Sequence, residues 1–104
     1  MKTPKVITQS ARDEPCTLNI VGVCTYDSET VVACHLSDGS GGSNRLTGPL
    51  NLCFGCSRCH DEIDGRTGYK LTTELQREFY MRRAMNRTIN RLIEKGLITV
   101  KGLK

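Results

Sequence analysis

The chain of 104 residues contains no tryptophan and only five aromatic residues, two Phe and three Tyr. Large aromatic side chains contribute much of the buried area of a small domain, so an apolar core made without them is marginal at this length. We therefore expect residues 1–104 to form a single domain that needs an additional staple, either covalent or metal-based.

Long hydrophobic runs are also missing. No apolar stretch approaches the length of a transmembrane helix, and no apolar segment typical of a secretory signal follows the basic start Met1 to Lys5. We therefore expect a cytoplasmic protein with no membrane partner. The formal net charge of +4 is mildly basic, which is compatible with a nucleic-acid partner, although this charge alone is weak support.

Six cysteines are the obvious candidates for the staple, and three of them crowd into residues 53–59. Thiols stay reduced in the cytoplasm, so closely spaced cysteines there indicate a metal site; the alternative is a secreted, disulfide-stapled interaction protein. Cys56 and Cys59 form a C-x2-C pair. Two thiolates at this spacing can occupy two corners of a zinc tetrahedron, at about 2.3 Å from the ion.

The second pair of zinc ligands is predicted to be Cys16 and Cys24, which lie near the turn residues Pro15 and Gly22. Their spacing is wider than that of a knuckle, so a hairpin is expected between them. Two alternatives stay open: Cys53 can pair with Cys56, and His60 can complete a site with three cysteines. In the favoured ligand set the two cysteines left over, Cys34 and Cys53, are buried as small apolar residues.

Two segments have clear patterns of secondary structure. The β-branched run Thr30–Leu36 predicts a strand, and residues 17–23 predict a shorter one. Residues 72–96 predict a C-terminal helix, because Thr73 and Gln76 match a capping box and Gly96 follows the last turn.

The remaining segments are expected to be irregular. Residues 1–12 are expected to form a flexible arm, and the Gly/Ser-rich residues 37–48 a loop. Within the C-terminal helix, Leu75, Phe79, Ile89, Leu92 and Ile93 are expected to share the apolar face.

Basic side chains recur along the same helix. Arg83, Arg87 and Arg91 are spaced four residues apart, with Arg82 and Lys95 nearby. Residues at this spacing share one helix face, so the arginines are predicted to bind the phosphate backbone of a nucleic acid, preferably DNA. The alternative is an ordinary solvated helix face.

Two histidines and a carboxylate suggest catalytic chemistry. His60 and Asp64 stand four residues apart, so on a short helix beginning at the cysteine knuckle they would share a face and bind one divalent cation. His35 ends the Val-rich strand, where an imidazole can act as general base on a water molecule. We expect the imidazoles of His35 and His60 to face one shared cleft.

The order of these residues resembles the HNH (ββα-metal) endonuclease superfamily. The resemblance is carried by Cys16, Cys24, His35, Asn51-Leu52 and the run Cys56-x2-Cys59-His60-x3-Asp64. It implies a small α+β fold in which His35 is the base, Asn51 braces the loop backbone, and His60 and Asp64 bind the catalytic cation.

A closer resemblance, to the YbcO-like nucleases carried by prophages, spans residues 11 to the final helix. It rests on Glu29-Thr30-x3-Cys34-His35 and on the run from Cys56 to Thr67. It implies a metal-dependent endonuclease that hydrolyses phosphodiester bonds, with structural Zn²⁺ and catalytic Mg²⁺, Mn²⁺ or Ni²⁺.

The sequence departs from the HNH pattern at two positions. Cys34 stands where an Asp or His often precedes the base, and Asp64 replaces the commoner His. A thiolate is a poor ligand for Mg²⁺. The alternative is therefore a non-catalytic zinc-binding module that binds DNA or a protein partner, and the oligomeric state is left open.

Overall fold

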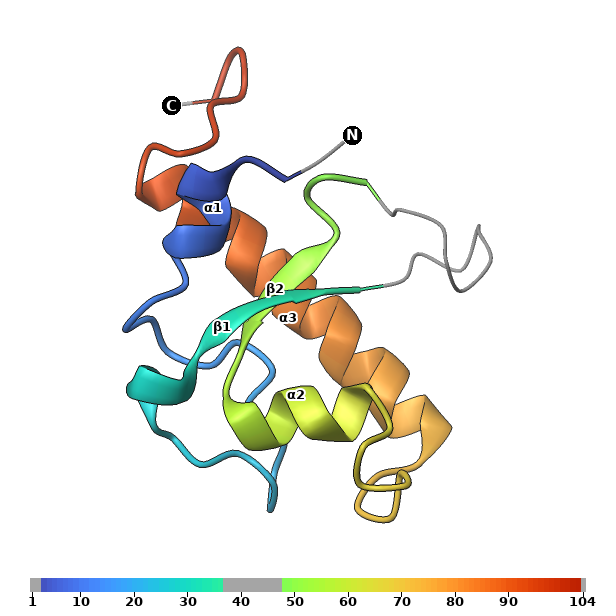
Figure 1. The fold of residues 1–104 in the computed structure, drawn as a ribbon. Coiled ribbons are helices and arrows are strands. Elements are labelled where there is room, and N and C mark those ends of the chain that lie inside the picture. The colour runs from blue at the N-terminus through green and yellow to red at the C-terminus, as the bar shows by residue number, and fades with distance from the viewer. Residues whose placement is uncertain (1–2, 37–47, 104) are drawn as a thin grey trace.

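The computed structural model describes residues 3–36 and 48–103. It is a small α+β domain whose described elements are three α-helices, one 3-10 turn and a two-stranded antiparallel sheet (Figure 1). No described helix has both the length and the apolar composition that crossing a bilayer requires. The predicted Gly/Ser-rich loop, residues 37–48, lies outside the described residues except for Gly48.

The sheet is a hairpin of β1 (Val32–His35) and β2 (Leu52–Gly55). Cys34 pairs with Cys53, and His35 pairs with Leu52. The strand predicted at residues 30–36 is therefore confirmed in its central part, after a 3-10 turn at Ser28–Thr30. The partner strand β2 was not predicted from its residues, because its four positions are buried on both faces and show no alternating pattern.

The long helix α3 (Glu74–Glu94) confirms the predicted C-terminal helix almost to the residue. Thr73 accepts a hydrogen bond from the Gln76 amide, and the Gln76 side chain accepts one from the Thr73 amide, which is the predicted capping box. At the other end Gly96 takes a φ of 74°, and the following amide of Leu97 donates to the Leu92 carbonyl.

The buried face of α3 differs from the predicted one. Its buried residues are Ala84, Thr88 and Leu92. Leu75 is 81% exposed and Phe79 is 49% exposed, so the prediction that they belong to the apolar face was wrong. Small residues allow α3 to approach β2 closely, and larger apolar residues near the start of the helix are left outside the core.

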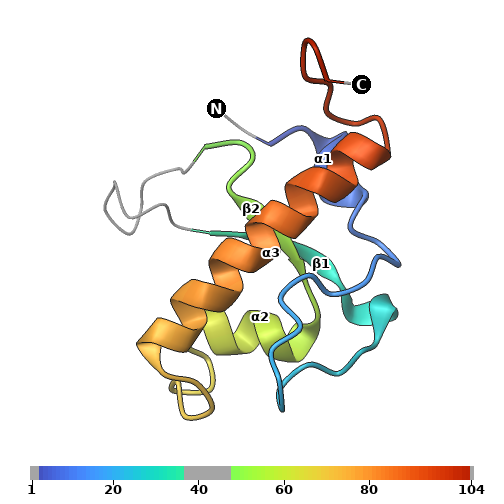
Figure 2. The same ribbon diagram turned by 180° about the vertical axis from the view of Figure 1, so that it is seen from behind.

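Helix α3 crosses the hairpin, with α1 (Lys5–Gln9) near its C-terminal end and α2 (Ser57–Ile63) near its N-terminal end (Figures 1 and 2). Thr17 and Thr88 join the layers. Their hydroxyl groups lie 2.9 Å apart, and both accept from the Phe54 amide, while the Thr17 amide donates to the Phe54 carbonyl. These contacts satisfy a backbone group of the sheet that would otherwise be buried without a partner.

Two segments near the N-terminus differ from their predicted structure. Within the predicted arm, residues 1–12, helix α1 forms and buries Ile7, and Ala11 is also fully buried. The arm prediction was wrong because these apolar residues supply core surface that a chain without tryptophan otherwise lacks. The strand predicted at residues 17–23 is also absent, since this segment consists of turns.

Candidate metal centres and active site

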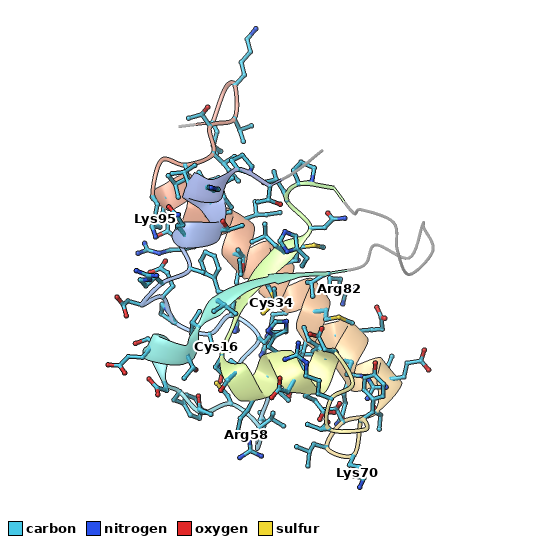
Figure 3. The ribbon with its side chains drawn as sticks, viewed as in Figure 1. Cys16, Cys34, Arg58, Lys70, Arg82 and Lys95 are labelled. Atoms are coloured by element: carbon cyan, nitrogen blue, oxygen red, sulfur yellow. The ribbon has the colours of Figure 1, made fainter. Side chains whose placement is uncertain are left out.

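Four cysteines converge at the N-terminal end of α2, where Figure 3 labels Cys16. The sulfur atoms of Cys16, Cys24, Cys56 and Cys59 all lie within 4.8 Å of one another. The Sγ atoms of Cys24 and Cys56 are 3.8 Å apart, which equals the sulfur–sulfur separation of about 3.8 Å expected for tetrahedral bonds of 2.3 Å to zinc. These four residues are the predicted ligand set, and they fit a zinc ion.

Local backbone geometry explains how the first pair of cysteines reaches this cluster. Asn19 and Tyr26 follow Cys16 and Cys24 closely, and both adopt a positive φ, 44° and 57°. These sharp turns direct the amide of Asn19 toward Cys16 Sγ at 3.3 Å and that of Tyr26 toward Cys24 Sγ at 3.4 Å. The hairpin expected between the two cysteines was therefore wrong, because tight turns take its place.

Backbone amides also reach the sulfur atoms of the second pair. The Ile20 amide donates to Cys59 Sγ, and the Cys59 amide donates to Cys56 Sγ, both at 3.5 Å. Cys56 is the N-cap of α2, so its sulfur sits at the positive end of the helix. Amide donors of this kind stabilise thiolates, the form in which cysteine binds metal.

The protonation of the four thiols follows from their mutual contacts. A hydrogen bond from the Cys59 thiol lowers the pKa of Cys16 to about 5 and raises the pKa of Cys59. Burial raises the pKa of Cys24 to about 11. Burial also opposes ionisation of Cys56, but backbone and hydroxyl donors outweigh it, so the pKa of Cys56 is lowered. Such a cluster holds negative charge and fits a bound cation.

The other two cysteines lie apart from this cluster. Cys34 and Cys53 face each other across the hairpin, are almost fully buried, and belong to the apolar core. Their predicted role as buried small residues is confirmed. Contact with Cys34, together with burial, raises the pKa of Cys53.

A second group of side chains lies at the C-terminal end of α2. His60 Nε2 lies 2.9 Å from Asp64 Oδ2, so the helix brings this pair together on one face as the spacing predicted. The pair is partly exposed, and Asp64 is the C-cap of the helix. His60 is not part of the four-cysteine group, which disfavours the alternative in which it binds the zinc.

Gly55 packs closely against its neighbours at the end of β2. A Cβ atom at Gly55 would lie 2.8 Å from Cys34 Sγ, 2.9 Å from a methyl carbon of Leu18 and 3.9 Å from His60 Cβ. Only glycine therefore leaves room for the Cys34 thiol and the Leu18 side chain here.

His35 ends β1 and is exposed. Its Nε2 lies 3.1 Å from the Thr3 hydroxyl group, which itself donates to the Pro49 carbonyl at 2.7 Å. Because the Thr3 proton is committed to Pro49, the imidazole donates to the Thr3 hydroxyl oxygen through Nε2. That His35 and His60 face one cleft stays a prediction.

Asn51 lies where the chain returns to the hairpin. Its carbonyl accepts from the Leu36 amide at 2.8 Å, and its amide donates to the Gly48 carbonyl at 3.1 Å. Asn51 therefore joins both ends of the segment that connects the two strands.

The three arginines predicted to bind phosphate differ in their surroundings. Arg83 donates to the carbonyls of Leu18 and Asn19, and Arg91 forms an ion pair with Glu14. Arg87 is exposed and has no carboxylate partner within residues 3–36 and 48–103. The three side chains thus do not form one free stripe, because two of them hold the N-terminal segment against α3.

The wider set of basic residues is also spread out. Figure 3 shows Arg58 and Lys70 along one edge of the molecule, whereas Lys95 lies at the opposite end of α3 from the loop that carries Lys70. The Lys95 ammonium group donates to the Ser10 carbonyl at 2.9 Å.

One buried carboxylate was missed by the sequence reasoning. Glu62 is fully buried and accepts hydrogen bonds from the hydroxyl groups of Thr67 and Thr72. Its Oε2 atom lies 4.0 Å from Arg77 Nη1. Burial opposes its ionisation, but these donors outweigh burial and lower the pKa of Glu62. Nothing in the sequence around Glu62 indicates that its side chain is buried. Thr67 and Thr72 lie in the turn after α2, and only the tertiary structure brings them back to Glu62.

Comparison with known proteins places the chain in a family. A family described as "Putative nuclease YbcO" matches residues 5–97. Proteins of the same name from Escherichia coli strain K12 and from Enterobacteria phage 82 are each 39% identical over 62 residues, which is 59% of this chain and 65% of each relative. The matched segment therefore spans less than two thirds of the relatives' length.

A solved structure supports the same relationship. It is described as a putative bacteriophage protein from Escherichia coli K-12 substrain MG1655, and it is 31% identical to this chain with a TM-score of 0.71. The alignment covers 86% of this chain and 98% of that one. The chain belongs to the YbcO family of phage-associated proteins, whose members carry the name of nucleases.

Proposed function

We propose that this protein is a metal-dependent endonuclease of the HNH type that hydrolyses phosphodiester bonds in DNA and is encoded by a phage or prophage. The observation that carries the proposal is the His60–Asp64 pair, 2.9 Å apart and partly exposed on a helix that the four-cysteine cluster fixes in place. The names of the relatives support nucleic acid as the substrate.

His60 Nε2 and the Asp64 carboxylate are the groups that would hold the divalent cation. When bound, such a cation stabilises the negative charge that develops on the phosphate during hydrolysis. An imidazole and a carboxylate together suit Mn²⁺, Ni²⁺ or another transition metal better than Mg²⁺, which prefers oxygen ligands.

His35 is the proposed general base. With its proton on Nε2, held by Thr3, the imidazole accepts the proton of the attacking water at Nδ1. The Thr3 hydroxyl group and the Pro49 carbonyl orient the ring and stabilise the imidazolium that forms. Asn51 supports this arrangement by fixing the backbone on both sides of the segment between the strands.

A second candidate function is a zinc-stabilised module that binds nucleic acid or a protein without cleaving anything. The observation that favours it is the closed nature of the four-cysteine site, which leaves no coordination position for a substrate. In this case exposed Arg87 would contribute to binding, and the His60–Asp64 pair would be a surface ion pair.

Cleavage of supercoiled plasmid DNA distinguishes the two functions. In the presence of Mn²⁺ or Ni²⁺ we expect cleavage by the wild-type protein, and a rate reduced by about 100-fold or more in His35→Ala and Asp64→Asn. Asp61→Asn is the matched control, because Asp61 is a carboxylate on the same helix that pairs with Arg66. Equal trace cleavage by the wild type and His35→Ala, at unchanged zinc content, contradicts the enzymatic proposal.

A further inference from the structure

The turn that follows α2, residues 65–73, carries an aromatic and cationic cluster outside the site described above. The Tyr69 side chain is 45% exposed, and the Arg77 guanidinium group lies 3.9 Å from the centroid of its ring. Leu71 in the same turn is also half exposed. This is an exposed ring with a cation stacked on it, close to a candidate site for phosphodiester cleavage.

The ring is fixed next to the proposed cation ligand. A Cβ atom at Gly65 would lie 2.6 Å from Tyr69 Cζ and Oη, so the phenol end of the ring packs directly against the backbone of the residue after Asp64. Tyr69 has a φ of 58°, which is costly for a bulky residue and persists only where surrounding contacts enforce it.

Glu62 supplies these enforcing contacts. It binds Thr67 and Thr72 on either side of Tyr69 and lies 4.0 Å from Arg77. Arg77 also donates to the carbonyl and the hydroxyl group of Thr72. The ring and the guanidinium group are therefore held in position before any ligand binds.

The charge around the ring suits a polyanion. Lys70 is exposed, and Figure 3 shows it projecting from the turn away from the body of the molecule. In the part of the chain that the structure describes, its ammonium group has no carboxylate partner. Aromatic rings stack on nucleobases of any sequence, and an adjacent exposed cation binds the phosphates that connect them. Lys70 is that cation, because the Arg77 side chain is only 14% exposed and is held by Glu62, Thr72 and the Tyr69 ring. A purely apolar protein partner would gain nothing from the charge of Lys70.

We propose that Tyr69 and Arg77 form a stacking platform for an unpaired nucleobase beside the His60–Asp64 pair, so that the substrate is single-stranded or locally unpaired nucleic acid. The proposal rests on the nuclease function proposed above and specifies its substrate class. A paired base inside a duplex does not present its face to such a ring, so the platform selects against intact duplex.

The absence of tryptophan from the chain makes a direct test possible. Tyr69→Trp and Tyr26→Trp each introduce a single fluorescent indole. Tyr26 is the matched control, because it is 76% exposed and has a φ of 57°. Titration with oligodeoxythymidylate of about 12 nucleotides, without added divalent metal, is expected to quench Tyr69→Trp and leave Tyr26→Trp unchanged.

A second measurement compares affinities by fluorescence anisotropy of a labelled oligonucleotide. Tyr69→Ala is expected to lose at least about fivefold in affinity for the single strand, whereas Tyr69→Phe and Tyr26→Ala stay near wild type. A parallel titration with oligouridylate shows whether RNA as well as DNA uses the platform.

Two results would overturn the platform. One is a Tyr69→Trp signal that saturating oligonucleotide does not change, or changes no more than that of Tyr26→Trp. The other is a duplex that binds as tightly as the single strand and loses affinity equally in Tyr69→Ala. Both readouts are binding alone, so they fail independently of the His35-dependent cleavage that tests the nuclease function.

Discussion

The two ends of α2 carry different groups of possible metal ligands. At its N-terminal end, Cys56 and Cys59 belong to a closed cluster of four sulfur atoms that receive several backbone amides. At its C-terminal end, His60 and Asp64 contact each other and are partly exposed. A metal site saturated with protein ligands stabilises a fold, whereas a site with few ligands leaves room for substrate. The helix therefore joins a candidate structural metal centre to a candidate catalytic one.

The largest effect is expected from removing one cysteine of the four-cysteine cluster at the N-terminal end of α2. Structural zinc contributes on the order of 10 kcal/mol to folding, comparable with the whole stability of a small domain. We therefore expect Cys59→Ser to abolish the cooperative thermal transition measured by circular dichroism and to lose the bound zinc.

Cys53→Ala is the matched control, since Cys53 is equally buried but lies outside the cluster. It is expected to keep one zinc ion per chain and a cooperative transition. A folded, cooperative Cys59→Ser protein would show that the cluster is not what stabilises the domain.

The exposed end is tested by changing the character of one proposed ligand. His60→Asp replaces a nitrogen ligand with a carboxylate, which suits Mg²⁺, so we expect the ratio of Mg²⁺-supported to Ni²⁺-supported cleavage to rise by about tenfold or more. The measurement is the initial rate of plasmid cleavage with each metal. Cys53→Ala again serves as the control, and an unchanged ratio would remove His60 from the metal site.

The turn between α2 and α3, residues 65–73, depends on the buried carboxylate of Glu62. The folded pKa of Glu62 lies below its unfolded value near 4.5, so its stabilising contribution is complete above that pH and is lost as the pH falls through the folded pKa. We expect Glu62→Gln to flatten the decline of unfolding free energy below that pH, measured by urea denaturation at several pH values. A decline as steep as that of the wild type would show that Glu62 is not responsible.

The smallest effect is expected far from both ends of α2, at the start of α3. Thr73→Ala removes the side-chain acceptor of the capping box and is expected to cost about 1 kcal/mol of unfolding free energy in urea. Exposed Thr99→Ala is the control. Thr73→Ala is expected to leave zinc content unchanged, and loss of zinc would show that α3 and the cluster are more tightly coupled than the contacts indicate.

Local chemistry determined what could be predicted from the sequence. The capping box of α3, the cluster of four cysteines and the His60–Asp64 pair depend on short spacings or on residue types with few alternatives. Helix α1 and strand β2 depend on which surfaces the folded core needs, and no local pattern reports that.

The contacts of the surface side chains were not predictable for the same reason. Whether Arg83 and Arg91 are free or hold the N-terminal segment depends on the path of residues 14–19, which are distant in sequence. The burial of Glu62 depends in the same way on threonines that follow the helix. Contacts of this kind are decided by tertiary structure.

Anomalous scattering from crystals grown with zinc and soaked in Mn²⁺ tests the difference between the two ends of α2 most directly. The account predicts a zinc peak at bonding distance from the sulfur atoms of the four clustered cysteines, and a separate manganese peak beside His60 Nε2 and the Asp64 carboxylate. A zinc ion bonded to His60, or no manganese peak at this pair, would contradict it.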